Sequence, residues 1–259
     1  MKASYFPGCT LKNKAKDLDI YARKSAEVLG VTLEEIENFQ CCGGVFTTSN
    51  DELATKLSSV RALREANKKG QPLVSVCSAC HNVLKQTNAM MKNVQSDASK
   101  RINNYISPEK YFGQTEVIHY LELLRDKIGF EKIKEKVVNP LTDKKIASYY
   151  GCLLLRPGKV MAMDDVENPT IMEDLVKSLG GEPIVYSYRN ECCGGYVALE
   201  SKELAMKRSQ KVIENAKEKG AEMIITACPL CLYNLKKCGE DLPIVYFTEL
   251  LAQALGVKE

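Results

Sequence analysis

The sequence predicts an α/β protein made of two tandem, pseudo-symmetric copies of a small domain, each a parallel sheet with flanking helices. Three observations predict this class. The 259-residue chain contains an internal repeat, both copies alternate short apolar runs with helical patterns, and cysteines cluster at matching places in each copy. Alternation of strands and helices is typical of parallel sheets that are covered by helices on both faces.

The repeat is clearest in the cysteines. Ten of the eleven form two sets of five, with the spacings C-x31-C-C-x34-C-x2-C and C-x39-C-C-x34-C-x2-C. The first set is Cys9, Cys41, Cys42, Cys77 and Cys80, and the second is Cys152, Cys192, Cys193, Cys228 and Cys231. The flanks match too: SYFPGCTL (4–11) resembles SYYGCLLL (148–155), and QCCGGVF (40–46) resembles ECCGGYV (191–197).

The copies divide the chain into two predicted domains. We expect the first at residues 1–140 and the second at 141–259, joined through the linker-like segment 138–143, which contains Pro140. The first domain carries an insertion at 85–115, rich in Lys, Asn and Ser, that the second lacks. We expect this insertion to be a surface excursion or a partner contact.

Within each copy the elements follow in the same order. Apolar runs at 3–6 and 145–150 predict first strands, each followed by a Gly-Cys. Helical spacing predicts helices at 51–69 and 201–219 that end at Gly70 and Gly220. Strands at 73–76 and 223–226 then run into the C-x2-C motifs. Every cysteine group thus follows a strand, at the carboxyl edge where open α/β sheets bind ligands.

Composition excludes several classes of protein. With 36 Lys+Arg against 33 Asp+Glu, the net charge of +3 gives no electrostatic basis for binding nucleic acid. No apolar run reaches the roughly 18 residues of a membrane span, and the first residues lack a signal-peptide core. We therefore expect a cytoplasmic protein. Eleven cysteines cannot all pair, and disulfides would not persist in a reducing compartment.

Metal or redox chemistry remains for the cysteines. Structural zinc often uses C-x2-C pairs, but tetrahedral zinc takes four ligands and each set offers five. A thioredoxin-like C-x2-C would not explain the CCGG motif, and one buried, unreactive cysteine per set would not explain its recurrence in both copies. An iron–sulfur cluster accommodates adjacent cysteines, although the spacing is not that of an ordinary cubane. Gly43-Gly44 and Gly194-Gly195 would let backbone N–H groups approach the sulfurs, or serve as flexible turns.

The doubled pattern, CCGG with CSAC and CCGG with CPLC, resembles the cysteine-rich domain of the B-type subunits of heterodisulfide reductases over nearly the whole chain. The resemblance implies two noncubane [4Fe–4S] clusters. One would be bound by Cys9, Cys41, Cys42, Cys77 and Cys80, and the other by Cys152, Cys192, Cys193, Cys228 and Cys231.

The resemblance also implies an activity and partners. The chain would be a disulfide-cleaving oxidoreductase, reducing a disulfide clamped between the clusters with electrons from flavin-containing (A-type) and ferredoxin-like (C-type) partner subunits. The chain itself has no G-x-G-x-x-G, P-loop or cubane motif. The alternative is a non-catalytic electron relay or scaffold in a related bacterial complex, linked to sulfur or folate metabolism.

A few residues outside the two sets invite a role. Leu153 stands where the methanogen enzymes carry a His. Lys12, Lys14, Lys16 and Arg156 lie near the first cysteines and could neutralise an anionic substrate, or be solvated surface cations. His81 follows a predicted ligand and could touch the site, whereas His119 aligns with Tyr246 and is expected in a strand. Cys238 has no counterpart in the first copy and is expected to be a plain thiol.

Overall fold

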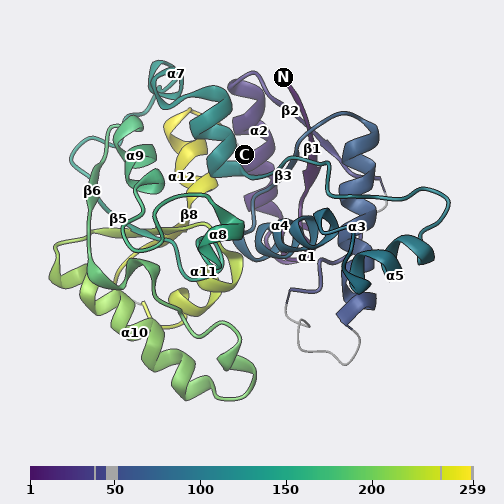
Figure 1. The fold of residues 1–259 in the computed structure, drawn as a ribbon. Coiled ribbons are helices and arrows are strands. Elements are labelled where there is room, and N and C mark those ends of the chain that lie inside the picture. Colours follow the sequence, from purple (N-terminus) through teal and green to yellow (C-terminus); the bar gives the residue numbers. More distant parts are fainter. Residues whose placement is uncertain (38, 45–51, 240, 258–259) are drawn as a thin grey trace.

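The computed structural model describes residues 1–37, 39–44, 52–239 and 241–257. Two four-stranded, all-parallel sheets occupy different halves of the molecule (Figure 1), in the orders β2-β1-β3-β4 and β6-β5-β7-β8. Their strands are β1 (Lys2–Phe6), β2 (Thr32–Glu35), β3 (Leu73–Ser75), β4 (Val117–His119), β5 (Lys145–Tyr149), β6 (Glu182–Ile184), β7 (Met223–Thr226) and β8 (Ile244–Tyr246). The predicted fold class is confirmed.

Helices connect the strands and cover the sheets. In the described part of the first half they are α1 (Cys9–Asn13), α2 (Lys16–Val28), α3 (Glu52–Lys68), α4 (Ser78–Lys92), α5 (Asp97–Tyr105), α6 (Tyr120–Glu122), a π-helical turn (Leu123–Ile128) and α7 (Phe130–Glu135). The second half has α8 (Gly158–Met161), α9 (Ile171–Ser178), α10 (Lys202–Glu218), α11 (Pro229–Lys236) and α12 (Phe247–Ala254), with 3-10 turns at Ser187–Asn190 and Val197–Leu199.

The central strands form the cores. Tyr5 and Phe6 of β1 and Tyr149 of β5 are fully buried, as expected for parallel strands covered on both faces. Registers correspond in the two sheets: Tyr5 pairs with Val74, and Ala147 pairs with Ile224. The long helices α3 and α10 lie within one residue of their predicted ends, although the predicted first residue Asp51 lies outside the described residues.

The insertion at 85–115 differs from the expected surface excursion. It contains the second half of α4 and all of α5, and it is held to the first core by buried polar side chains. Asn88 donates to the Thr115 carbonyl, and Asn103 bonds both backbone groups of Tyr111. The polar composition was misleading because these amide side chains hydrogen-bond buried backbone instead of water.

The two halves are packed together. Figure 1 shows α12 beside α2, and the Thr248 hydroxyl donates to the Leu18 carbonyl, 3.2 Å away. Asn82 of α4 donates to the carbonyls of Leu153 and Arg156 in the other half. A domain boundary at residue 140 stays a prediction. Among the described helices, none has both the length and the apolar character required to cross a membrane.

Candidate metal centre

All ten cysteines of the two sets lie beyond the carboxyl ends of parallel strands, as predicted from the order of elements. In the first half, Cys9 follows β1 and Cys77 follows β3. Cys77 and its equivalent Cys228 are the residues that cap α4 and α11. The same crossover pattern occurs twice, so both sets converge on the contact between the two sheets.

The ten sulfurs form one row that runs through both halves. Sulfur–sulfur distances are 3.7 Å for Cys9–Cys41, 3.4 Å for Cys42–Cys80 and 3.4 Å for Cys193–Cys231. These distances exceed the roughly 2.05 Å of a disulfide, so the cysteines are free. Counting every thiol–thiol interaction, the order is Cys9, Cys41, Cys42, Cys80, Cys77, Cys228, Cys231, Cys193, Cys192 and Cys152.

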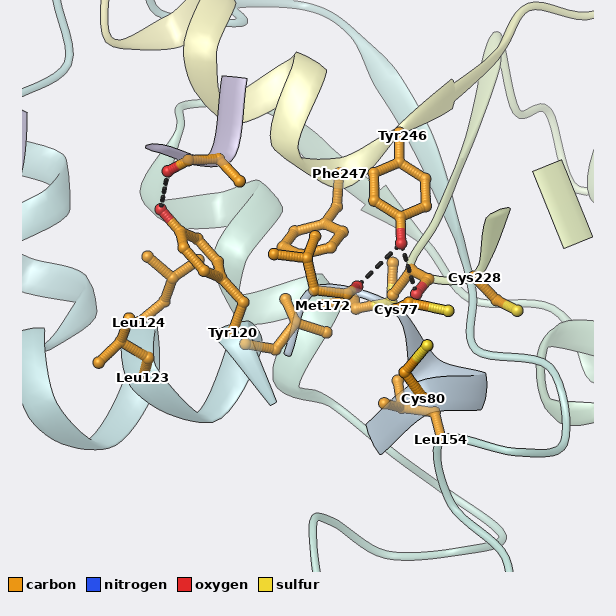
Figure 2. Close-up of a cluster of buried hydrophobic side chains, with 14 of the residues drawn as sticks. Cys77, Cys80, Tyr120, Leu123, Leu124, Leu154, Met172, Cys228, Tyr246 and Phe247 are labelled. Carbon is orange, nitrogen blue, oxygen red and sulfur yellow. Dashed lines mark hydrogen bonds between the residues drawn. The ribbon is translucent and has the colours of Figure 1, made fainter. Parts of the chain in front are cut away.

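The two sets meet at Cys77 and Cys228, whose thiols interact across the contact between the halves (Figure 2). Ser78 fastens this point, since its backbone N–H and its hydroxyl both donate to the Ala227 carbonyl, at 3.1 and 2.7 Å. The Tyr246 hydroxyl lies 2.8 Å from the Val76 carbonyl and 2.9 Å from that of Ala227. The residues before both C-x2-C motifs are therefore joined.

The donor set fits an iron–sulfur group. Each set offers five thiols. Six of the ten are buried, and only Cys41 is exposed. Across the part of the chain that the structure describes, no three His, Cys, Asp or Glu side chains surround one point as ligands of a single metal ion. Thiols from several loops, in an apolar shell, are the donors that iron–sulfur clusters use.

Each adjacent pair contains one thiol that ionises readily. A hydrogen bond from Cys41, with further help from neighbouring groups, lowers the pKa of Cys42 to about 4, while the pKa of Cys41 is raised. In the second set a hydrogen bond from Cys152 contributes most to lowering the pKa of Cys192 to about 2, and its bond to Cys192 raises the pKa of Cys193 to about 12. The thiolate is the form that binds metal, so each pair presents one ligand already ionised.

Backbone groups also approach the sulfurs. The N–H of Gly43 donates to the sulfur of Cys41 at 3.5 Å, and the N–H of Gly194 donates to that of Cys192 at 3.3 Å, as the CCGG motif suggested. The glycine before each first cysteine was not singled out from the sequence. Gly151 has φ +63°, and a Cβ there would lie 3.2 Å from the Cys231 sulfur, so a side chain would crowd the site.

One small cavity contains the complete second set. Cys152, Cys192, Cys193, Cys228 and Cys231 all line it. Around them lie Tyr150, Leu153, Gly195, Tyr196 and Leu230, together with Ser78 from the first half. The second set is therefore closed by a residue of the other copy.

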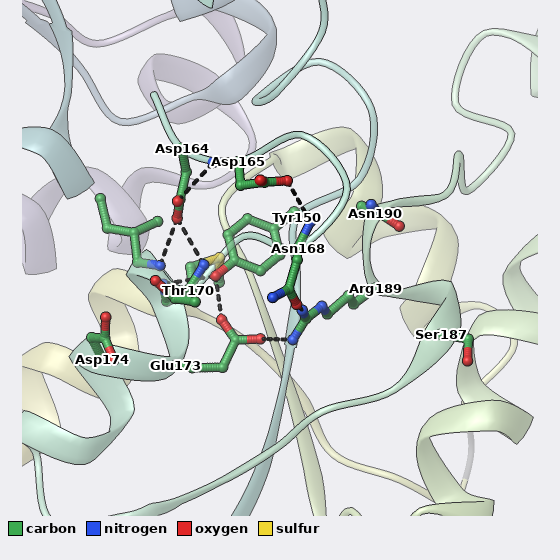
Figure 3. A network of polar contacts seen from close by, with 12 residues as sticks. Tyr150, Asp164, Asp165, Asn168, Thr170, Glu173, Asp174, Ser187, Arg189 and Asn190 are labelled. Atoms are coloured by element: carbon green, nitrogen blue, oxygen red, sulfur yellow. Dashed lines mark hydrogen bonds and ion pairs between the residues drawn. The ribbon is translucent and has the colours of Figure 1, made fainter. Parts of the chain in front are cut away.

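A buried polar network supports this cavity from behind (Figure 3). The Tyr150 hydroxyl donates to the carboxylate of Glu173 and accepts from the Met172 N–H. Arg189 pairs with Glu173 at 2.9 Å and also donates to Asn168. Its carbonyl accepts the backbone N–H of Tyr150 at 2.8 Å. The loop that leads to the first cysteine of the second set is thereby fixed, in a way that Phe6 at the equivalent position cannot reproduce.

The four cations expected near the first cysteines have different surroundings. Lys12 is paired with Glu35, and Arg156 with Glu167 at 3.3 Å, so their charges are partly compensated within the chain. The other two, Lys14 and Lys16, are exposed.

The two histidines lie in the core of the first half. His119 ends β4, as predicted, and its Nε2 is 3.0 Å from the Val76 carbonyl. His81 is fully buried in α4 and packs against His119 with ring centroids 5.4 Å apart. Its pKa is lowered well below the usual value, first by burial, so the ring is neutral. Cys238 stays outside the row, with its sulfur 3.8 Å from the Met206 carbonyl.

Sequence reasoning missed the hydroxyl groups that join the halves. Ser78, Tyr196 and Tyr246 each bond a backbone carbonyl beside the cysteines. Only the alignment of Tyr246 with His119 was a signal, since equivalent positions in a repeat often bond equivalent carbonyls.

Comparison with known proteins agrees with this arrangement. The chain is 32% identical to the 8-methylmenaquinol:fumarate reductase membrane anchor subunit of Wolinella succinogenes, over 98% of this chain and 92% of that protein. It is 29% identical to the B-type subunit of the ferredoxin/F420H2-dependent CoB–CoM heterodisulfide reductase of Methanosarcina acetivorans, over 98% and 89% of the two chains.

A solved structure and a family model complete the comparison. A hypothetical protein from Helicobacter pylori shares the fold, with a TM-score of 0.73 at 11% identity, over 100% of this chain and 49% of that one. The model of the CCG cysteine-rich domain matches twice, at residues 3–85 and 146–236. The chain, which its cysteines and relatives identify as an iron–sulfur redox subunit, belongs to the CCG cysteine-rich domain family and carries two copies of that domain.

Proposed function

We propose that the chain is the disulfide-cleaving subunit of a heterodisulfide reductase-type complex, and that each five-cysteine set binds one noncubane [4Fe–4S] cluster. One observation carries the proposal. The sulfurs of both copies form a single row, with Cys77 of one set beside Cys228 of the other. Two sites that acted independently would need no such contact.

The contact suits the chemistry of a disulfide. Cleavage breaks one S–S bond, consumes two electrons and two protons, and gives two thiols. Two clusters supply one electron each when bound, and positive iron stabilises the anionic sulfurs. The chain holds both sets at a fixed separation through Ser78 and Tyr246, and its apolar shell limits access of water.

Electrons come from other subunits in this proposal, because the sequence has no nucleotide-binding or cubane motif. Relatives named as B-type heterodisulfide reductase subunits support flavin-containing (A-type) and ferredoxin-like (C-type) subunits as donors, and a cytoplasmic location.

Disulfide turnover tests the proposal. The holoprotein is prepared without oxygen, reduced methyl viologen serves as the one-electron donor, and a panel of disulfides is offered. We expect two thiols to be released for every two electrons consumed with at least one disulfide. Oxidation of the dye without release of thiols from any of them would contradict the proposal.

The relative from Wolinella succinogenes favours a second candidate. It is named as part of a quinol:fumarate reductase and aligns over 92% of its length. A relay subunit of such a complex would pass electrons between partners without cleaving a disulfide. In that case the two sets would be reduced and reoxidised by a quinol analogue while no thiol is formed.

A further inference from the structure

Tyr196 joins the two CCGG loops. It follows Gly194-Gly195 of the second copy, and its hydroxyl donates to the carbonyl of Gly44 in the first copy at 2.8 Å. In the sequence repeat its counterpart is Val45, so the chain has this hydroxyl on one side only. A hydroxyl that reaches from one set of cysteines to the other lies where a molecule held between them would have to pass.

The side chain also borders the sulfurs themselves. Tyr196 lines the cavity that contains all five cysteines of the second set. The pKa of its phenol is raised, first by burial and then by the negative charges of Cys228, Cys152, Cys42 and Cys77. Because charges act over short distances in a protein interior, the hydroxyl lies near sulfurs of both sets.

Other hydroxyls at this cavity are committed elsewhere. Tyr150 donates to the buried carboxylate of Glu173, which also pairs with Arg189. Ser78 donates to Ala227. Tyr196 is only half-buried, and it can exchange its bond to the Gly44 carbonyl for a stronger one, since hydrogen bonds to anions exceed those to neutral acceptors.

We propose that Tyr196 is a catalytic residue that donates a hydrogen bond to the sulfur anion formed when the disulfide is cleaved. The inference rests on the proposed function. The S–S bond breaks as two electrons arrive from the donor protein, and each sulfur becomes a thiolate that takes its proton from water. The phenol keeps its own proton throughout and turns from Gly44 toward the new anion.

A thiol that mimics the product tests this contact without turnover. The oxidised holoprotein is titrated with 2-mercaptoethanol, and binding is followed by the visible absorption of the clusters. We expect Tyr196→Phe to weaken binding about tenfold or more, because it removes one hydrogen bond to an anion. Tyr188→Phe is the matched control, since this tyrosine is 38% exposed and belongs to the same half; its affinity should equal that of the wild type.

A second variant separates this role from a structural one. Replacing Tyr196 by 3-fluorotyrosine preserves the bond to Gly44 and makes the phenol a stronger donor, so thiol binding should tighten. The inference is overturned if Tyr196→Phe binds the thiol as the wild type does with its iron content unchanged, or if the fluorinated protein binds no more tightly. Disulfide turnover by the wild type is measured separately: its absence contradicts the proposed function, whereas the thiol titration decides the role of Tyr196.

Discussion

His119 and Tyr246, which occupy equivalent positions in the two copies, both hydrogen-bond the carbonyl oxygen of Val76. Each residue also caps the helix that follows it, and each cap is completed by a glutamate three residues later, Glu122 or Glu249. The repeat has thus kept one capping arrangement twice, but Tyr246 is longer and reaches across to the other copy. A local helix cap became a tie between the two halves.

The first prediction concerns that tie. Tyr246→Phe should lower the free energy of unfolding by about 1 kcal/mol, because His119 still bonds Val76 and Ser78 still bonds Ala227. For a chain of this size the melting temperature should fall by roughly 2–4 °C. Tyr233→Phe, at a side chain 58% exposed, should leave it unchanged. Thermal unfolding of the three proteins decides, and equal melting temperatures would show that the tie contributes nothing.

A second prediction concerns the metal. Protein isolated without oxygen should be brown and contain about eight irons, four for each set of five cysteines. Metal analysis and Mössbauer spectra measure this directly. Two zincs and no iron would remove the basis of the proposed function.

Each half should bind its own metal group. Cys42→Ser should disturb the first cluster alone and Cys193→Ser the second alone, because no cysteine is shared between the sets in this assignment. Cys238→Ser is the control and should change neither iron content nor activity, since its sulfur lies outside the row. Loss of iron in that control equal to the loss in Cys193→Ser would show that the eleventh cysteine was assigned wrongly.

Loading of iron should strengthen as pH rises. Cys192, with its pKa lowered to about 2, is ionised throughout the working range, but Cys193, with its pKa raised to about 12, must release a proton when it binds metal. Each released proton strengthens binding about tenfold per pH unit. Competition with a chelator between pH 6.5 and 8.5 measures the slope, and an affinity that is constant or falls with pH would contradict it.

The sheets and the places of the cysteines were predictable because they depend on local patterns that occur twice. Apolar runs such as 3–6 and 145–150 become central strands, and whatever follows a parallel strand reaches the same sheet edge. The repeat therefore supplied a check on every element, since each was expected at two places.

The bonds between the halves could not be predicted. Tyr196 and Gly44 are 152 residues apart, and Ser78 and Ala227 are 149 apart. No short-range pattern encodes such pairs, because they depend on how the two sheets pack. For the same reason the polar composition of 85–115 concealed buried residues such as Asn103, whose partners are known only once the chain is folded.

The central claim is that both cysteine sets serve one shared site. The decisive measurement is the rate of thiol release by Cys41→Ala and by Cys192→Ala, each supplied with electron donor and partner subunits, while the remaining cluster is shown to be reducible. A single set offers one electron and one place for a sulfur, so the account predicts that both variants are inactive. Roughly half of the wild-type rate in each variant would contradict it and would indicate two separate sites.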